Sequence, residues 1–101
     1  MAKRTIVWTE TAANQRREIL RYWTELTKST IYAEKLIKIT ARNLKIISKN
    51  PEAFKETEID DVRESAMGHF SLYYKITTKE IIVVAFWDNR QDPKKLLKAI
   101  S

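Results

Sequence analysis

The chain has 101 residues, of which 44% are hydrophobic and 32% charged, with a formal net charge of +6 and no cysteine. The length and composition predict one domain over residues 1–101 with a single core. The absence of cysteine excludes disulfides and cysteine-ligated zinc. Because His69 is the single histidine, we expect no metal and no cofactor. No apolar stretch is long enough to cross a bilayer and no signal peptide is recognisable, so we expect a cytoplasmic protein without a membrane partner.

The first 26 residues predict a strand followed by a helix. Residues 4–8 alternate so that Ile6 and Trp8 share one face, which is typical of a short strand. Residues 9–11 offer capping hydroxyls, and helical periodicity then runs over residues 12–26. The apolar stripe of this helix consists of Ala12, Ile19, Leu20, Trp23 and Leu26.

Residues 31–48 predict a second helix with two opposed faces. The apolar face carries Ala33, Leu36, Ile37, Thr40, Leu44 and Ile47. The opposite face carries a cationic row, made of Lys35, Lys38, Arg42, Lys45 and Lys49. Two interpretations of the cationic row stay open, a solvated helix surface and a surface that faces an anion.

The charge of the chain is unevenly placed along the sequence. Residues 1–51 carry eleven basic and four acidic residues, which is +7, whereas residues 52–64 carry two basic and six acidic residues, which is −4. Residues 65–101, with six basic and three acidic residues, contribute +3. Asn50 and Pro51 end the second helix, and the acidic segment after them is expected to be a loop.

The last 40 residues predict three strands and a short helix. Strands are expected at residues 62–67, 69–76 and 81–87, with a tight hairpin at 77–80. A helix is expected over residues 94–100, capped by Asp92. The predicted fold is therefore α+β: an N-terminal strand, a two-helix hairpin packed on a mostly antiparallel four-stranded sheet, and a short C-terminal helix.

These segments, in this order, resemble the RelE/ParE superfamily of toxins from type II toxin–antitoxin modules. The resemblance is carried by "VWTETAANQ", "YAEKL", the "NP" after the second helix, "VRES", "FSLYYKI" and "FWDNRQDPKKL". It implies a growth-inhibiting, plasmid-stabilising toxin whose partner is a cognate antitoxin. RelE-like members cut messenger RNA on the ribosome without a metal, whereas ParE-like members inhibit DNA gyrase.

The residues favour the ParE-like branch. RelE-like toxins place an arginine near the start of the strand that here begins at Phe70 and Ser71, and they carry a tyrosine or histidine in their final turns. Neither feature is present in this chain. Arg90 and Asp92-Pro93 instead look like the ParE end. A RelE-like endonuclease stays open as the alternative, and a degenerate toxin that only binds stays open as a third.

Cleavage of RNA needs an acid, a base and a cation on the phosphate. If the chain is RelE-like, the resemblance points to His69 and Tyr73 for proton transfer and to Arg63 and Arg90 as phosphate clamps. His69, Ser71, Tyr73 and Lys75 alternate onto one sheet face. That face, or an edge strand of the sheet, is expected to be open to an added peptide.

The polar cluster after the last strand is the second candidate site. Arg90 lies among Asp88, Asn89, Gln91 and Asp92, so a carboxylate from Asp88 or Asp92 is expected to hold it. We expect the target-binding residues of a ParE-like toxin to be Trp87, Arg90, Asp92, Lys94 and Lys95.

Overall fold

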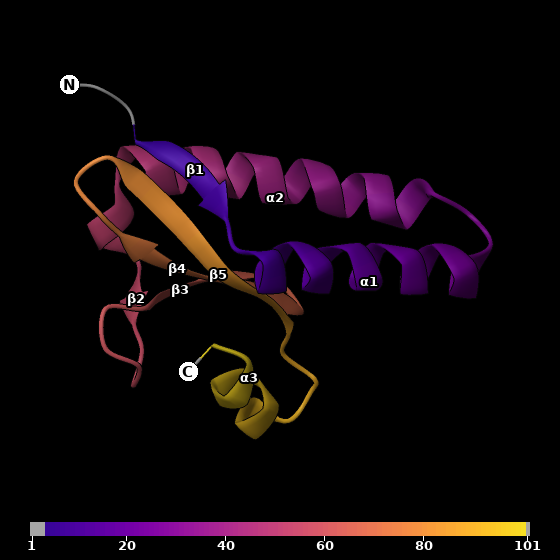
Figure 1. The fold of residues 1–101 in the computed structure, drawn as a ribbon. Helices are drawn as coiled ribbons and strands as arrows, with labels where there is room; N and C mark the ends of the chain where they lie inside the picture. Colours follow the sequence, from indigo (N-terminus) through magenta and orange to yellow (C-terminus); the bar gives the residue numbers. More distant parts are fainter. Residues whose placement is uncertain (1–3, 101) are drawn as a thin grey trace.

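A computed structural model describes residues 4–100 of the chain. The α+β class and the predicted element order are confirmed (Figure 1). The elements are β1 (Thr5–Trp8), α1 (Glu10–Thr27), α2 (Ile31–Lys49), the 3-10 turn η1 (Pro51–Ala53), β2 (Lys55–Glu56), β3 (Arg63–Met67), β4 (Phe70–Ile76), β5 (Glu80–Asp88) and α3 (Pro93–Ile100).

The sheet has five strands in the order β1-β5-β4-β3-β2, one more than predicted. The additional strand, β2, pairs antiparallel with β3 through two residues inside the segment that was expected to be a loop. A strand of two residues has no alternating pattern, so its sequence carries no signal. β1 runs parallel to β5, and the remaining pairs are antiparallel. A parallel pair needs a long connection, which the α1–α2 hairpin and three strands supply here.

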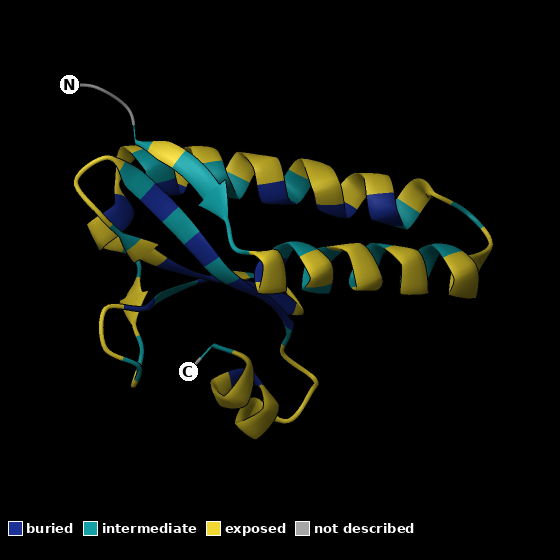
Figure 2. Cartoon of the chain, in the orientation of Figure 1, coloured by how far each residue is buried: buried dark blue, intermediate teal, exposed yellow. Residues whose placement is uncertain are grey.

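The α1–α2 hairpin covers one face of the sheet (Figure 1). Thr9 caps α1, since its Oγ1 accepts a hydrogen bond of 3.1 Å from the Ala12 amide. Lys28, with a left-handed φ of 55°, ends that helix and turns the chain into α2. In α2, the buried positions lie toward the rest of the molecule and the exposed positions lie on the opposite side (Figure 2).

The main core lies between this hairpin and the sheet. Buried apolar side chains from α1, α2, β4 and β5 fill it, namely Ala12, Leu36, Ile47, Phe70, Leu72, Tyr74, Ile81, Val83 and Phe86. Two residues assigned to the apolar stripes are exposed, Leu26 at 58% and Ile37 at 39%. Leu26 lies near the end of α1, where Figure 1 shows the hairpin extending past the sheet, and Ile37 lies at the edge of the buried face of α2.

The opposite face of the sheet is partly covered, which corrects the prediction of an open face. α3 places Leu96 against Val62, Tyr73, Ala85 and Trp87, and these five residues form a second, smaller core. Ser71 is fully buried on this face, whereas Lys75 stays exposed. An added peptide therefore has no free access to the middle of this face. Within residues 4–100, no helix is long and apolar enough to span a membrane.

Candidate functional site

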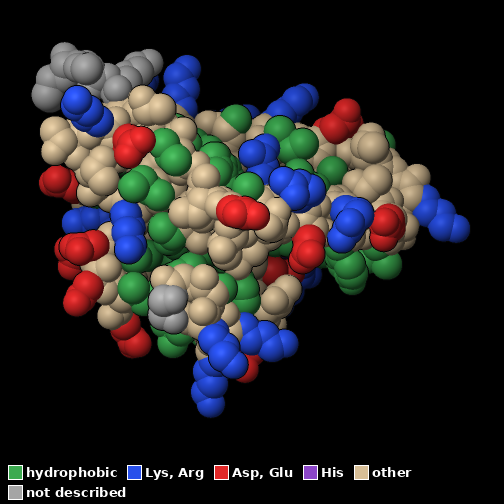
Figure 3. Space-filling view, viewed as in Figure 1, with side chains coloured by type: hydrophobic (Ala, Val, Ile, Leu, Met, Phe, Trp, Pro, Cys, Tyr) green, Lys and Arg blue, Asp and Glu red, His purple; other side chains and the backbone are tan. Residues whose placement is uncertain are grey.

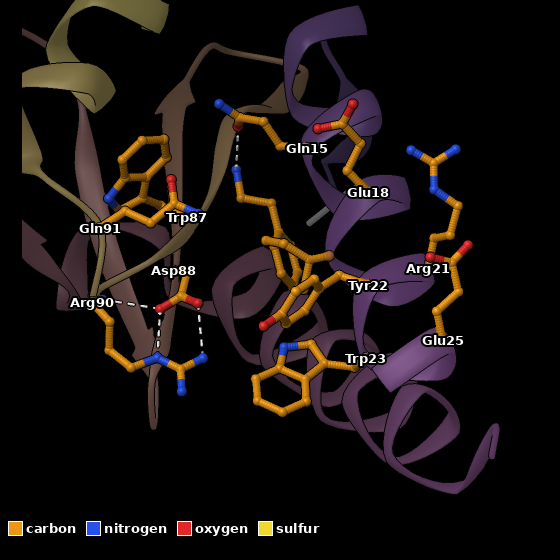
Figure 4. A pocket seen from close by; sticks show the side chains of 12 residues that line it. Gln15, Glu18, Arg21, Tyr22, Trp23, Glu25, Trp87, Asp88, Arg90 and Gln91 are labelled. Carbon is orange, nitrogen blue, oxygen red and sulfur yellow. Dashed lines mark hydrogen bonds and ion pairs between the residues drawn. The ribbon is translucent and has the colours of Figure 1, made fainter. Parts of the chain in front are cut away.

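A groove of about 760 Å³ runs between α1 and the end of β5 (Figure 4). It exists because β1 stops at Trp8, opposite Val83, while β5 continues to Asp88. Beyond that point β4 still pairs with one edge of β5, and α1 takes the place of β1 beside the other edge. Gln15 of α1 takes the place of a strand there, since its Oε1 accepts a hydrogen bond of 2.9 Å from the Phe86 amide.

Arg90 lies at one end of the groove and is held in a defined position by Asp88. Its Nε donates to Asp88 Oδ1 at 2.9 Å and its Nη2 donates to Oδ2 at 2.8 Å, and its backbone amide bonds to the same Oδ1 (Figure 4). The guanidinium carbon lies 5.3 Å from the ring centroid of Trp23 and 5.9 Å from that of Phe70. The arginine is thus oriented by a bidentate carboxylate and by two aromatic rings.

The remaining edge of the Arg90 guanidinium is available to a ligand. The side chain is 48% exposed, and within residues 4–100 no protein group accepts a hydrogen bond from Nη1. Hydrogen bonding from Arg90 lowers the pKa of the Asp88 carboxyl, so this carboxylate stays charged. An oriented cation with one free donor edge suits a carboxylate or phosphate of a partner.

The rest of the groove carries mixed charge and exposed aromatic surface. Glu18, Arg21 and Glu25 line it from α1, and Tyr22 between them is 58% exposed. The Tyr22 ring meets Trp23 edge-on at 5.3 Å between centroids. Aromatic side chains beside an arginine are the residue types that anchor protein interfaces.

The four candidates for RNA cleavage are not brought together. Arg63 lies beside Tyr74 in the β3–β4 register, on the hairpin face, and donates to the carbonyls of Glu52 and Phe54. Tyr73 lies on the opposite face, beneath α3, because successive residues of a strand point to opposite sides. A catalytic pair of Arg63 and Tyr73 is therefore not formed.

The pKa of Tyr73 is also higher than that of a ready proton donor. Burial, together with the charge of Glu64 and a hydrogen bond to it, raises the pKa of Tyr73 to about 12. His69 precedes β4 in an exposed turn, whereas Ser71 and Tyr73 are buried. His69 lies at the Arg90 end of the sheet, where its carbonyl accepts a hydrogen bond of 2.8 Å from the Asn89 amide.

Two polar residues that the sequence analysis did not single out, Glu64 and Gln15, have structural roles near the site. Ser71 Oγ donates to Glu64 Oε2 at 2.8 Å and accepts a hydrogen bond of 2.9 Å from Asn89 Nδ2. Gln15 caps the open edge of β5. These contacts cross 7, 18 and 71 positions of sequence, so no local pattern reports them.

The residues expected to bind a target fall into two groups. Trp87 is 8% exposed and packs in the core under α3, and it also lines the groove. Asp92 caps α3, because its Oδ1 accepts a hydrogen bond of 3.0 Å from the Lys94 amide. Lys94, Lys95 and Arg90 are exposed and form the accessible part of this end.

Comparisons with known proteins agree with this architecture. The sequence matches, over residues 6–93, the family described as ParE toxin of type II toxin–antitoxin system, parDE. No curated protein matches the chain. A solved structure described as the chromosomal ParDE TA system from P. aeruginosa is similar with a TM-score of 0.72 and 19% identity, covering 83% of this chain and 94% of that chain.

The structural similarity shows the class of protein: a small α+β domain with the fold seen in that ParDE system. The family match covers most of the chain and is more specific. This chain belongs to the ParE toxin family of type II toxin–antitoxin systems. Membership of this family implies an antitoxin partner.

Proposed function

We propose that this chain inhibits growth by binding DNA gyrase, in the manner of the ParE-like branch, and that it does so without cleaving a substrate. In this proposal the exposed groups at the Arg90 end, together with Lys94 and Lys95, contact the target. The proposal also includes a cytoplasmic location, silencing by a cognate antitoxin and a role in plasmid stabilisation.

The observation that carries the proposal is the orientation of Arg90. A bidentate carboxylate and two aromatic rings fix its guanidinium while one donor edge stays open. Binding through such a residue loses little side-chain entropy, because the side chain is ordered before the partner arrives. Pre-ordered arginines beside exposed aromatic rings are typical of binding hot spots.

One feature supports the alternative, a ribosome-dependent mRNA endonuclease: two of its candidate residues lie close to each other. His69 and Arg90 lie at the same end of the sheet, where the carbonyl of His69 accepts a hydrogen bond of 2.8 Å from the amide of Asn89, the residue before Arg90. Against it stand the positions of Arg63 and Tyr73 on opposite faces of the sheet. An RNA phosphate cannot contact both side chains at once without rearrangement of the sheet.

One induction experiment tests the proposal against the alternative. The chain is induced in bacterial cells, and plasmid supercoiling, gyrase–DNA cleavage complexes and mRNA ends are measured in the same culture. Loss of supercoiling or accumulation of cleavage complexes is the expected result. Codon-positioned cuts in mRNA would assign the endonuclease, and unaffected growth would leave the chain as a binding module.

A variant pair links the result to Arg90. We expect Arg90→Ala to weaken target binding by on the order of 30-fold, as for a hot-spot arginine, and to relieve growth inhibition. Arg17→Ala is the matched control, because Arg17 is also exposed but lies outside the groove, and within residues 4–100 its side chain bonds only to Asn14. Equal toxicity of Arg90→Ala and the parent chain, at equal folded amounts, would contradict the role of Arg90.

A further inference from the structure

The cationic row of α2 is a continuous exposed surface. Its five members, Lys35, Lys38, Arg42, Lys45 and Lys49, are all exposed. Steps of three and four residues keep them on one side of the helix, and 14 residues at 1.5 Å each give a row about 21 Å long. Figure 2 shows this outer side of α2 as exposed, and Figure 3 shows Lys and Arg side chains projecting along the upper edge of the molecule.

Other parts of the protein do not neutralise this row. Glu34 is the single acidic residue of α2, so the helix carries five positive charges against one negative charge. Among residues 4–100 none of the five cations forms an ion pair, and the ion pairs present are Arg63–Glu56 and Arg90–Asp88. Acidic side chains gather instead at the left of Figure 3, around β2 and the loop that follows it. The cationic row therefore keeps its charge for an external partner.

The apolar face of α2 is not available to that partner. Leu36, Thr40 and Ile47 of this face are buried in the domain. A lipid surface or a hydrophobic peptide groove binds an amphipathic helix through its apolar face. The exposed isoleucines at positions 31, 37 and 46 point in different directions at 100° per residue, so they form no continuous strip. The contact has to be electrostatic.

We propose that the cationic row binds the phosphate backbone of a nucleic-acid duplex without sequence preference. A straight, rigid row of evenly spaced cations matches a regular line of fixed negative charges, and lysine and arginine are the residues that neutralise phosphates. Single strands are bound through aromatic stacking, and the row contains no aromatic residue. This inference rests on α2 alone and does not depend on the proposed function, whose residues lie at the Arg90 end of the sheet.

Salt dependence tests the inference, because each neutralised phosphate releases counterions. A labelled 25-base-pair DNA duplex is titrated with the 101-residue chain between 50 and 200 mM salt, and anisotropy is measured. If all five cations contact phosphates, the slope of log K against log salt is about −4.5. The triple variant Lys38→Gln, Arg42→Gln and Lys45→Gln is expected to reduce the slope to about −1.8 and to weaken binding more than about tenfold at 50 mM salt.

A control variant with the same charge change separates the row from net charge. Lys55→Gln, Lys75→Gln and Lys79→Gln alter three exposed lysines of the sheet region and are expected to keep a slope close to that of the parent chain. Glutamine is a good helix former, so circular dichroism should show unchanged helix content in both variants. The double variant Lys38→Arg and Lys45→Arg should retain binding, because both positions keep their positive charge.

Further ligands identify the source of the phosphates. Binding to duplex RNA with the same slope supports recognition of a duplex backbone in general, and weaker binding to duplex RNA supports DNA. The inference is overturned if the chain does not bind either duplex at 50 mM salt, or if both triple variants lose affinity equally. Preference for single-stranded DNA, or for vesicles of phosphatidylglycerol, over the duplex would also overturn it.

Discussion

Asp88 is the residue on which the position of Arg90 depends. Sequence reasoning placed two carboxylates, Asp88 and Asp92, within reach of this arginine and left the choice open. In the structure Asp88 accepts both guanidinium hydrogen bonds, whereas Asp92 caps α3. The choice follows from the turn after β5, in which Gln91 N donates to the Asp88 carbonyl and folds Arg90 back over the strand end.

We predict that Asp88→Asn lowers the melting temperature at pH 7 and that the difference disappears in acid. Arg90 lowers the pKa of Asp88 in the folded chain, so the stabilisation is present above the unfolded pKa of about 4 and is lost as the pH falls through the lower folded value. Thermal unfolding between pH 2.5 and 7, followed by circular dichroism, measures the difference. Asp60→Asn, at an exposed position that forms no ion pair among residues 4–100, should show little effect at either pH. An equal difference at pH 2.5 and pH 7 would rule out the ion pair as the cause.

Tyr74 illustrates how one buried polar group joins two elements. Its hydroxyl donates a hydrogen bond of 2.6 Å to the Pro51 carbonyl in η1, and the side chain is fully buried. We predict that Tyr74→Phe lowers the free energy of unfolding by about 1–3 kcal/mol, because the buried carbonyl of Pro51 loses its donor. Urea unfolding measures this change.

Tyr22→Phe is the matched control for that measurement, since Tyr22 is 58% exposed, and it should leave stability unchanged.

Burial, opposed in part by the charge of Arg63, raises the pKa of Tyr74 to about 12. The stabilisation that comes from the neutral phenol is therefore complete below pH about 10 and is lost as the pH rises through 12. A Tyr74→Phe chain as stable as the parent at pH 7 would show that the hydrogen bond contributes nothing.

Among the helices and strands, α3 is the element whose packing surface was hardest to predict. Its start at Pro93 and its Asp92 cap are local features and agree with the sequence. The surface it covers, formed by Val62, Tyr73 and Trp87, comes from three other segments of the chain. The prediction of an open sheet face failed for this reason.

The neighbouring leucines of α3 test its packing. We predict that Leu96→Ala lowers the free energy of unfolding by about 2–4 kcal/mol and shifts tryptophan emission to longer wavelength, because Leu96 covers Trp87. Leu97→Ala should change stability by less than about 0.5 kcal/mol, since Leu97 is 43% exposed. Equal effects of the two substitutions on stability and fluorescence would show that α3 does not pack as described.

At the scale of the whole molecule, β5 connects the parts. It pairs with β1 and β4, carries Ile81, Val83 and Phe86 into the core under the helical hairpin, and carries Ala85 into the core under α3. Its continuation beyond the end of β1 creates the groove, and the turn at its end holds Arg90. The apolar run that identified β5 in the sequence therefore also explains why the candidate site lies where it does.

The charges show the same division between local pattern and global arrangement. The cationic row was predicted from helical periodicity, and the structure places all five residues on the exposed side of α2. In the sequence, the acidic segment 52–64 follows directly after this basic helix. Its one ion pair among the described residues is instead Glu56 with Arg63, on neighbouring strands.

The order of the helices and longer strands could be predicted from the sequence, as could the two faces of α2, the cap of α3 and the resemblance to the RelE/ParE superfamily. These features are local or are linear patterns, because hydrophobic periodicity and capping depend on residues a few positions apart. The folded chain was needed to see that Asp88 holds Arg90 against Trp23, that Gln15 caps β5, and that Tyr73 and Arg63 lie on opposite faces. Such contacts depend on strand order, on register and on where one strand extends beyond the end of its neighbour. These three features follow from how the whole chain packs.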